Sequence, residues 1–439
     1  MLAAEPAFVL VDTAVVGHLG ARALAGLSVG GTLLSLVAMI GGFLDYGTTG
    51  RAARWYGAGD RDRAVDEGVT ATVLALGLGV AGAALGEVVA GPVLHLLTGP
   101  NTAVRADALL WFRVAVLGLP GVLVVLAGNG WMRGVQDTRR PVAIVVGANV
   151  ASAVASPLLV YVAGMGLVGS AVANVAAQAA AGALFVRALR SERRPWRPTG
   201  ERLRGQLRVG RDLLVRAAAF QACFLTASAV ASRMGTAQVA AHQVGLQLWT
   251  FVALLLDSFA IAAQSLVGAA LGAGDPHAAR ATAARVGRAG LWAGAAAGAA
   301  LAGGWWLLPG LFTSSPAVIH QAHLLWPLLA GMQPLAGVLF ALDGVLIGAG
   351  DVAFMRSLTV GAALGVFVPV DLAALHWHWG VTGVWAGLTG FVACRLAGML
   401  VRARGERWLV AGDGPAANTG DGPAAGTGGT GNADAVGAG

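Results

Sequence analysis

One carboxylate stands inside an apolar segment near the start of the chain. Asp12 lies in the run from Val9 to Val16, which ends in a turn bounded by Gly17 and Gly20. A carboxylate in hydrocarbon is costly, and desolvation favours its protonated form, so an acid in this position is a candidate proton carrier. The alternative is an aspartate that hydrogen-bonds a neighbouring helix for packing alone. Residue chemistry leaves both interpretations open.

Other acids are expected at membrane depth, with fewer basic residues to neutralise them. They include Asp45, Asp257, Asp343 and Asp371, and the possible counter-charges are Arg113, Arg216 and Arg395. The surplus of acids predicts an acidic cavity that attracts cationic substrates. The alternative for each acid is a structural ion pair, such as Asp257 with Arg216.

Uncharged polar residues and prolines also interrupt the apolar segments. His242, Gln243 and Gln247 share one expected helix, where they are candidates for lining a substrate cavity or for hydrogen bonds between helices. Pro120 and Pro334 fall inside expected helices, which predicts a kink at each. Because the two prolines occupy equivalent places in an internal repeat, they are candidate hinges, with packing as the alternative role.

Two short glycine-rich turns could suggest a phosphate-binding loop. Gly57-Ala58-Gly59-Asp60 returns as Gly272-Ala273-Gly274-Asp275, but neither copy follows an expected strand or precedes a lysine. We instead expect a glycine to end one helix and the aspartate to cap the next. Acids and histidines do not cluster at one membrane face, so we expect a protein that is not an enzyme and that holds no cofactor or metal.

The composition indicates a membrane protein with many spans. Of 439 residues, 56% are hydrophobic and only 12% are charged, whereas a soluble domain has about 25% charged residues. All basic residues are arginine, and we explain the net charge of +7 by membrane topology rather than by nucleic-acid binding. We expect contact with membrane lipids, a monomer, and no nucleic-acid partner.

The hydropathy pattern predicts twelve transmembrane helices and an all-α fold. Their expected ranges are 1–16, 23–48, 68–94, 105–130, 141–163, 167–190, 212–231, 237–270, 284–309, 319–348, 356–375 and 381–403. The first range is shorter than the roughly 20 residues that span a bilayer. We therefore expect that the chain lacks the beginning of its first helix.

An internal repeat divides these helices into two halves. Residues 20–60 match residues 235–275 at an offset of 215, and at an offset of 214 Pro120 meets Pro334 and Asp137 meets Asp351. Six helices in each half place both halves in the same orientation, related by a pseudo-two-fold axis along the membrane normal. We expect an N-terminal lobe over 1–190, a basic linker over 191–211, a C-terminal lobe over 212–405 and a disordered tail over 406–439.

Arginine predicts the orientation of the chain. The connections on one side hold nearly all loop arginines, including the dense run over 187–211, whereas the other side holds only Arg22, Arg105 and Arg233. By the positive-inside rule, both termini and the linker are cytoplasmic. We expect a multi-pass protein of the bacterial inner membrane.

Several motifs resemble those of multidrug and toxic compound extrusion (MATE) transporters, in particular the branch of DNA-damage-inducible protein F (DinF). They are Val11-Asp12-Thr13-Ala14-Val15-Val16-Gly17-His18-Leu19-Gly20, Arg133-Gly134-Val135-Gln136-Asp137-Thr138, Ala240-Ala241-His242-Gln243, Leu256-Asp257-Ser258-Phe259-Ala260-Ile261-Ala262 and Leu342-Asp343-Gly344-Val345-Leu346-Ile347-Gly348. The resemblance covers nearly the whole chain except the tail.

The resemblance implies alternating access, with drugs exported in exchange for H⁺ or Na⁺, and a coupling carboxylate on the first helix, here Asp12. Relatives add an asparagine, an aspartate and a threonine on helices 5 and 6, and the matching positions here are Ser152, Ser156 and Asn174. The second acid of the family pattern is missing. That absence weakens a Na⁺ site and favours H⁺.

We therefore expect a secondary active exporter of amphiphilic, cationic, drug-like compounds, driven by proton antiport through Asp12. The alternative is a flippase for lipids or lipid-linked precursors of related architecture, which predicts a cavity rich in arginine. A membrane enzyme that acts on lipid is disfavoured, because it needs clustered acids or a histidine-rich metal motif.

Overall fold

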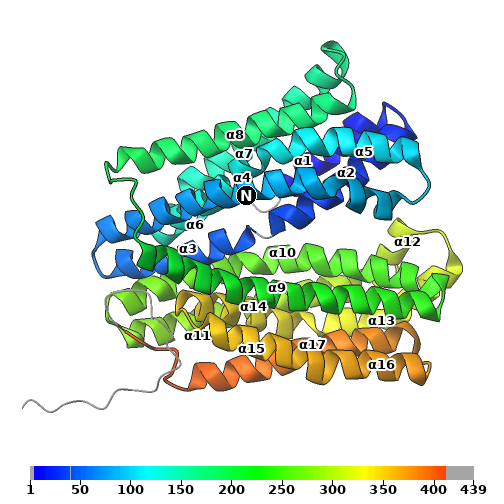
Figure 1. Cartoon of the computed structure of the whole chain (residues 1–439). Helices are drawn as coiled ribbons and strands as arrows, with labels where there is room; N and C mark the ends of the chain where they lie inside the picture. Colours follow the sequence, from blue (N-terminus) through cyan, green and yellow to red (C-terminus); the bar gives the residue numbers. More distant parts are fainter. Residues whose placement is uncertain (1–3, 40, 412–439) are drawn as a thin grey trace, which may run out of the picture.

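The structure is a computed structural model that describes residues 4–39 and 41–411. Its helices stack in two layers, one running from blue through cyan to the bluish green of α8 and the other from the green of α9 to orange in Figure 1. The first layer holds α1 (Ala4–Gly17), α2 (Ala21–Met39), α3 (Gly42–Gly57), α4 (Arg61–Thr98), α5 (Thr102–Ala115), the turn η1 (Val116–Gly118), α6 (Leu119–Gly134), α7 (Arg139–Pro157), the π-helical turn η2 (Leu158–Val162) and α8 (Leu167–Ser191). We call this layer the N-lobe.

The second layer, the C-lobe, repeats this order. It holds α9 (Gly200–Met234), α10 (Thr236–Gly272), α11 (Pro276–Gly303), the short α12 (Leu308–Phe312), α13 (Pro316–Gly331), α14 (Gln333–Gly348), α15 (Val352–Ala362), the π-helical turn η3 (Ala363–Phe367), α16 (Val368–His376) and α17 (Gly380–Arg404). When interrupted helices are joined, the chain has the expected two-lobe, twelve-helix, all-α architecture.

Most of these helices are suited to a bilayer. Within the described residues, nine helices are long and apolar enough to span a membrane, and the bent pair α13–α14 makes a tenth. The apolar part of α1 over Phe8–Gly17 is shorter. Interruptions absent from the hydropathy pattern divide several expected single helices, most visibly the expected segment 319–348, which bends by 47° between α13 and α14.

The two glycine-rich turns are helix caps, as the sequence predicts. Gly59 and Gly274 have φ of 80° and 74°, a left-handed conformation that favours glycine. Asp60 then accepts a hydrogen bond from the Arg63 backbone N–H, and Asp275 accepts one from Ala278 N–H, each at 2.8 Å. The two halves therefore turn between helices by the same local chemistry.

The paired prolines lie at helix starts, not in helix interiors. Pro120 occupies the first turn of α6, directly after η1, and Pro334 occupies the first turn of α14, directly after the α13–α14 bend. A proline is tolerated in a first turn because the backbone N–H it lacks has no helical partner there. The helix is thus interrupted immediately before each proline, by η1 before Pro120 and by the 47° bend before Pro334.

The lobes meet closely at the end of the bundle that carries the linker, which we call the basic end. There α3 crosses α10, and a Cβ on Gly57 would lie 1.9 Å from the carbonyl oxygen of Ala269. A Cβ on Gly272, the repeat partner of Gly57, would lie 1.9 Å from the carbonyl oxygen of Arg54. We call this crossing the glycine seal, and it admits no side chain larger than hydrogen at either glycine.

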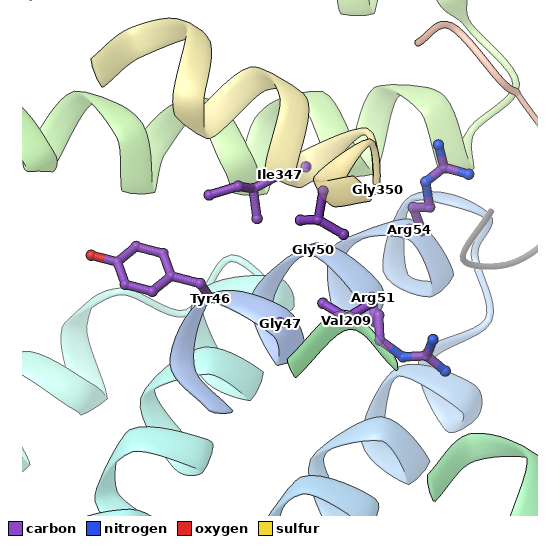
Figure 2. Close-up of a pocket in the computed structure, with 10 residues that line it drawn as sticks. Tyr46, Gly47, Gly50, Arg51, Arg54, Val209, Ile347 and Gly350 are labelled. Atoms are coloured by element: carbon purple, nitrogen blue, oxygen red, sulfur yellow. The ribbon is translucent and has the colours of Figure 1, made fainter. Parts of the chain in front are cut away.

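Hydrogen bonds between the lobes surround the glycine seal. Ser265 Oγ donates to the carbonyl oxygen of Arg133 at 2.7 Å, and Gln264 donates to that of Tyr46. Figure 2 shows the small pocket beside the seal, about 30 Å³ in volume, where Gly50 of α3 faces Ile347 and the turn that follows α14. The lobes are thus closed against each other at the basic end.

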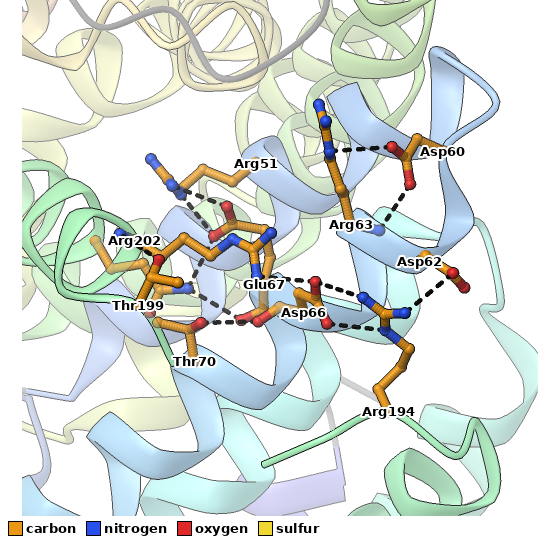
Figure 3. Close-up of polar contacts among 11 residues, drawn as sticks. Arg51, Asp60, Asp62, Arg63, Asp66, Glu67, Thr70, Arg194, Thr199 and Arg202 are labelled. Carbon is orange, nitrogen blue, oxygen red and sulfur yellow. Dashed lines mark hydrogen bonds and ion pairs between the residues drawn. The ribbon is translucent and has the colours of Figure 1, made fainter. Parts of the chain in front are cut away.

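Ion pairs fasten the linker to the N-lobe (Figure 3). Asp66 on α4 accepts hydrogen bonds from Arg194 at 2.9 Å and Arg202 at 2.8 Å, and the bond to Asp66 raises the pKa of the half-buried Arg194 guanidinium. Glu67, also on α4, is paired with Arg51 at 2.8 Å. Hence α9, a C-lobe helix, begins attached to the N-lobe, and it begins at Gly200, inside the segment expected to be linker.

The chain after α17 lies across the basic end. The Trp408 side chain is buried and its Nε1 donates to the carbonyl oxygen of Ala403 at 3.0 Å. Arg54 of α3 donates to the carbonyl oxygens of Val410 at 2.9 Å and of Ala349, at the end of α14, at 3.0 Å. Part of the segment expected to be a tail is therefore packed, and residues 412–439 of that segment lie outside the described residues.

Candidate functional site

Asp12 is a buried carboxylate at the centre of a hydroxyl cluster in the N-lobe. Its side chain is carried by α1, and Asp12 is only 6% exposed. Ser156 Oγ on α7 donates to Oδ1 at 2.7 Å, and Ser170 Oγ on α8 donates to Oδ2 at 2.7 Å. Three helices therefore meet at this one acid, so a change in its charge alters contacts on all three.

The resemblance pointed to three polar neighbours of Asp12, and the structure places them differently. Ser156 contacts the carboxylate directly. Ser152, one turn earlier on α7, is buried with a hydroxyl that makes no hydrogen bond to a described residue. Asn174 is half-buried one turn beyond Ser170, and no hydrogen bond joins it to Asp12 among the described residues.

Ser170 is the hydrogen-bond donor to Asp12 that sequence reasoning missed. It lies in the first turn of α8, after Gly166, and also accepts a hydrogen bond from Trp111 Nε1 at 3.3 Å. The spacing of four residues to Asn174 places both on one helix face. That spacing is the feature of the sequence from which Ser170 could have been predicted to lie near Asp12.

A cavity of about 450 Å³ lies between the lobes, on the side of the glycine seal away from the basic end. Its walls come from α2 and α3 of the N-lobe and, in the C-lobe, from α9, α10, the break between α13 and α14, α14 itself, and α17. Its lining is mainly apolar and includes the aromatic residues Phe43, Tyr46, Phe220, Phe224, Trp249, Phe340 and Phe391. Asp12 is not part of this lining.

The charged residues of the cavity are balanced, not predominantly acidic. Among its lining residues, two arginines, Arg216 and Arg395, stand with two acids, Asp257 and Asp343. The expectation of an acidic cavity is therefore wrong, because Arg216 on α9 and Arg395 on α17 also line the cavity.

Asp343 is neutralised from two sides. Arg216 Nη2 lies 2.7 Å from one carboxylate oxygen, and Arg395 Nη2 lies 2.9 Å from the other. Both guanidinium groups also lie over the ring of Phe220, at 5.4 and 4.5 Å from its centroid. The pairing of Arg216 with Asp257, which the sequence left open as an alternative, is thus wrong, since Arg216 binds Asp343 instead.

Asp257 is the cavity acid that no described arginine pairs with. Its Oδ2 accepts a hydrogen bond from the Tyr46 hydroxyl at 2.8 Å, which joins α10 of the C-lobe to α3 of the N-lobe. Asp45, the neighbour of Tyr46, is paired with Arg133 at 2.8 Å and lies outside the cavity lining. Asp257 is consequently the acid best placed to meet a cation inside the cavity.

The polar residues expected on the helix of His242 lie away from this cavity. His242 is buried in the C-lobe, with Nε2 3.3 Å from Ser228 Oγ and its ring beside Trp385. Gln243 and Gln247 are exposed, and neither is part of the cavity lining. Of the six residues expected to line the cavity, only Asp257 and Asp343 are among its described lining residues.

Comparisons with known proteins agree over nearly the whole chain. It is 33% identical to DNA damage-inducible protein F of Escherichia coli over 414 residues, which is 89% of this chain and 86% of that protein. It is also 31% identical to Protein DETOXIFICATION 44, chloroplastic, of Arabidopsis thaliana, over 90% of this chain and 78% of that protein.

Solved structures have the same fold. A crystal structure of MATE in the bent conformation superposes with a TM-score of 0.85 at 21% identity, covering 92% of each chain. An outward-facing multidrug resistance MATE family transporter superposes with a TM-score of 0.79, covering 91% of this chain and 92% of that one. The MatE family model matches residues 1–158 and 213–372, so the chain belongs to the MatE family of membrane transporters.

Proposed function

We propose that this transporter exports amphiphilic, cationic compounds in exchange for protons, and that Asp12 is the coupling carboxylate. The observation that carries the proposal is the burial of this single acid among the hydroxyls of Ser156 and Ser170. An ionised Asp12 accepts both hydrogen bonds, whereas a protonated one gives up part of that acceptor capacity. Protonation therefore changes how α1 is held against α7 and α8.

The ligand set favours H⁺ over Na⁺ as the coupling ion. Asp12 supplies the only carboxylate in the described cluster, and both serine hydroxyls already direct their protons at it. A hard metal cation needs several oxygen atoms turned toward it, including carboxylates. A proton needs only one carboxylate oxygen.

In the proposed cycle, a proton reaches Asp12 from outside, α1 bends or repacks against α7 and α8, and the N-lobe wall of the cavity between the lobes changes shape. That change expels the substrate, and the lobes then separate at the basic end to accept another. By the positive-inside rule, we place the basic end, the linker and both termini in the cytoplasm of a bacterial inner membrane.

Transport by the purified protein in liposomes tests this proposal. Protein reconstituted in proteoliposomes is given a pH gradient and then, separately, a Na⁺ gradient, and ethidium movement is followed by fluorescence. We expect transport under the pH gradient. Transport under the Na⁺ gradient alone would reject proton coupling, and no ethidium transport under either gradient would reject the proposed substrate class.

Asp257 is the residue that we expect to hold the cation of the substrate. A hydrogen bond to a charged group is worth about 1.5–3 kcal/mol. Asp257→Asn should therefore weaken ethidium binding by about 10- to 100-fold, since 1.4 kcal/mol corresponds to a factor of ten. The measurement is ethidium fluorescence titration of the purified protein, with Thr250→Val, another change in the cavity wall, as the control. Equal affinity in wild type and Asp257→Asn would contradict this assignment.

The second candidate is a flippase for lipids or lipid-linked precursors. Arg216 and Arg395 in the cavity favour it, because two guanidinium groups suit an anionic headgroup. Their joint pairing with Asp343 favours the exporter, since an anionic substrate would have to displace that carboxylate. Scrambling of a fluorescent anionic lipid in the same proteoliposomes, without ethidium transport, would select the flippase.

A further inference from the structure

A second acid is buried in the C-lobe without a partner. Asp371 lies on α16 and is fully buried, and neither of its carboxylate oxygens makes a hydrogen bond to a described residue. Every other buried acid in the described part of the chain has an arginine or hydroxyl partner. Asp371 has no role in the exchange mechanism proposed above.

The helices packed against α16 bring no cation to this carboxyl. On α17, Gly387 makes room for it, because a Cβ there would lie 2.6 Å from Asp371 Oδ1. On α9, the titratable group within electrostatic reach is the buried thiol of Cys223. The arginines of these two helices nearest the cavity, Arg216 and Arg395, are both directed at Asp343.

The internal repeat makes the position of Asp371 in the C-lobe equivalent to a position in the Asp12 cluster of the N-lobe. The offset between the halves is 214 at the Asp137–Asp351 and Gly169–Gly383 pairs. Each π-helical turn holds one residue more than an α-helical turn, and η3 precedes Asp371 whereas η2 follows Ser156. Between these two turns the offset is therefore 215, which makes Asp371 the counterpart of Ser156.

The two lobes thus hold a buried acid at equivalent places, but on different helices. In the N-lobe the carboxylate comes from α1, at Asp12, and α7 supplies the hydroxyl of Ser156. In the C-lobe the offset of 215 puts Ala227 of α9 at the position of Asp12, and the carboxyl comes from α16, at Asp371. At this equivalent place, each half supplies one acid.

We propose that Asp371 is a second proton-binding site and that it carries its proton in the conformation described. An ionised carboxylate that is fully buried without a donor or a cation is strongly disfavoured, so the group becomes neutral instead. This site goes beyond the proposed exchange mechanism, which uses Asp12 alone. It does not depend on that mechanism, because a bound proton is detectable without transport.

Infrared spectroscopy of the purified full chain in lipid tests the proposal. At neutral pH we expect a carbonyl band of protonated carboxyl groups that loses a component in Asp371→Asn. The matched control is Asp107→Asn, which removes a partly exposed carboxylate that is paired with Arg22 at 2.7 Å and is expected to leave the band unchanged. A band that is the same in wild type and in folded Asp371→Asn would overturn the proposal.

A second variant covers the case in which Asp371→Asn does not fold. Gly387→Ala keeps the carboxyl and places a methyl group against Oδ1. We expect this contact to shift the frequency of the same carbonyl component, because the environment of the protonated group changes. An unshifted band would overturn the proposal. If Asp12 proves not to drive transport, both infrared results still stand.

Discussion

Proteoliposomes that contain Asp12→Asn are expected to transport ethidium under a pH gradient no faster than protein-free liposomes. Asparagine has nearly the same shape as aspartate and still accepts a hydrogen bond from Ser156 or Ser170, but it cannot exchange a proton. The cluster therefore stays folded while coupling is lost. The measurement is the initial rate of ethidium fluorescence change at equal protein content.

A matched variant separates loss of the proton carrier from loss of packing. Ser170→Ala keeps the carboxylate and removes one of its two donors. We expect Ser170→Ala to retain transport, with a pH dependence different from that of wild type. Normal transport by Asp12→Asn would eliminate this acid as the coupling group, whatever Ser170→Ala does.

The second large effect is expected at the glycine seal. Gly57→Ala places a methyl group where the Ala269 carbonyl oxygen lies, so α3 and α10 must move apart at the basic end. Overpacking of this kind costs about 1–3 kcal/mol. Each 1.4 kcal/mol shifts a conformational equilibrium tenfold, so the closed state described here loses about 5- to 150-fold in population relative to an open one.

Cysteine labelling at the seal measures that shift. Ser265→Cys, in a chain with Cys223→Ser and Cys394→Ser, puts a thiol at the position whose hydroxyl donates to Arg133 across the seal. We expect Gly57→Ala to speed the reaction of this thiol with a polar reagent. The control is Gly287→Ala on α11, where a Cβ meets no atom within 4 Å. Equal rates in both variants would show that the crossing does not hold the lobes together.

Features that depend on a few adjacent residues could be predicted from the sequence. The glycine-aspartate turns are confirmed as caps because a left-handed glycine and a capping carboxylate act within one helical turn. The two-lobe, all-α architecture was also predictable, since hydropathy and the repeat extend over hundreds of residues and tolerate local errors. Interruptions of the helix were predictable near Pro120 and Pro334, although each precedes its proline and only the one before Pro334 is shown as a bend.

Partners across helices could not be predicted in the same way. Arg216 binds Asp343 and not Asp257, because the rotation of α9 about its own axis decides which acid it faces. That rotation depends on packing that no single segment encodes. Ser170 was missed because the family pattern pointed one turn further along α8, to Asn174. The π-helical turns, which change the register between the halves by one residue, have no signal in hydropathy.

The ion pairs that attach the linker to the N-lobe make that attachment sensitive to salt. Arg194 and Arg202 hold Asp66 while their own side chains remain 30% and 26% exposed. Dissolved salt screens charges in such positions, with a Debye length of about 8 Å at physiological ionic strength. The glycine seal, in contrast, rests on close contact between uncharged backbones. Ionic strength on the linker side will therefore adjust how firmly α9 is tethered, and leave the crossing of α3 and α10 unaffected.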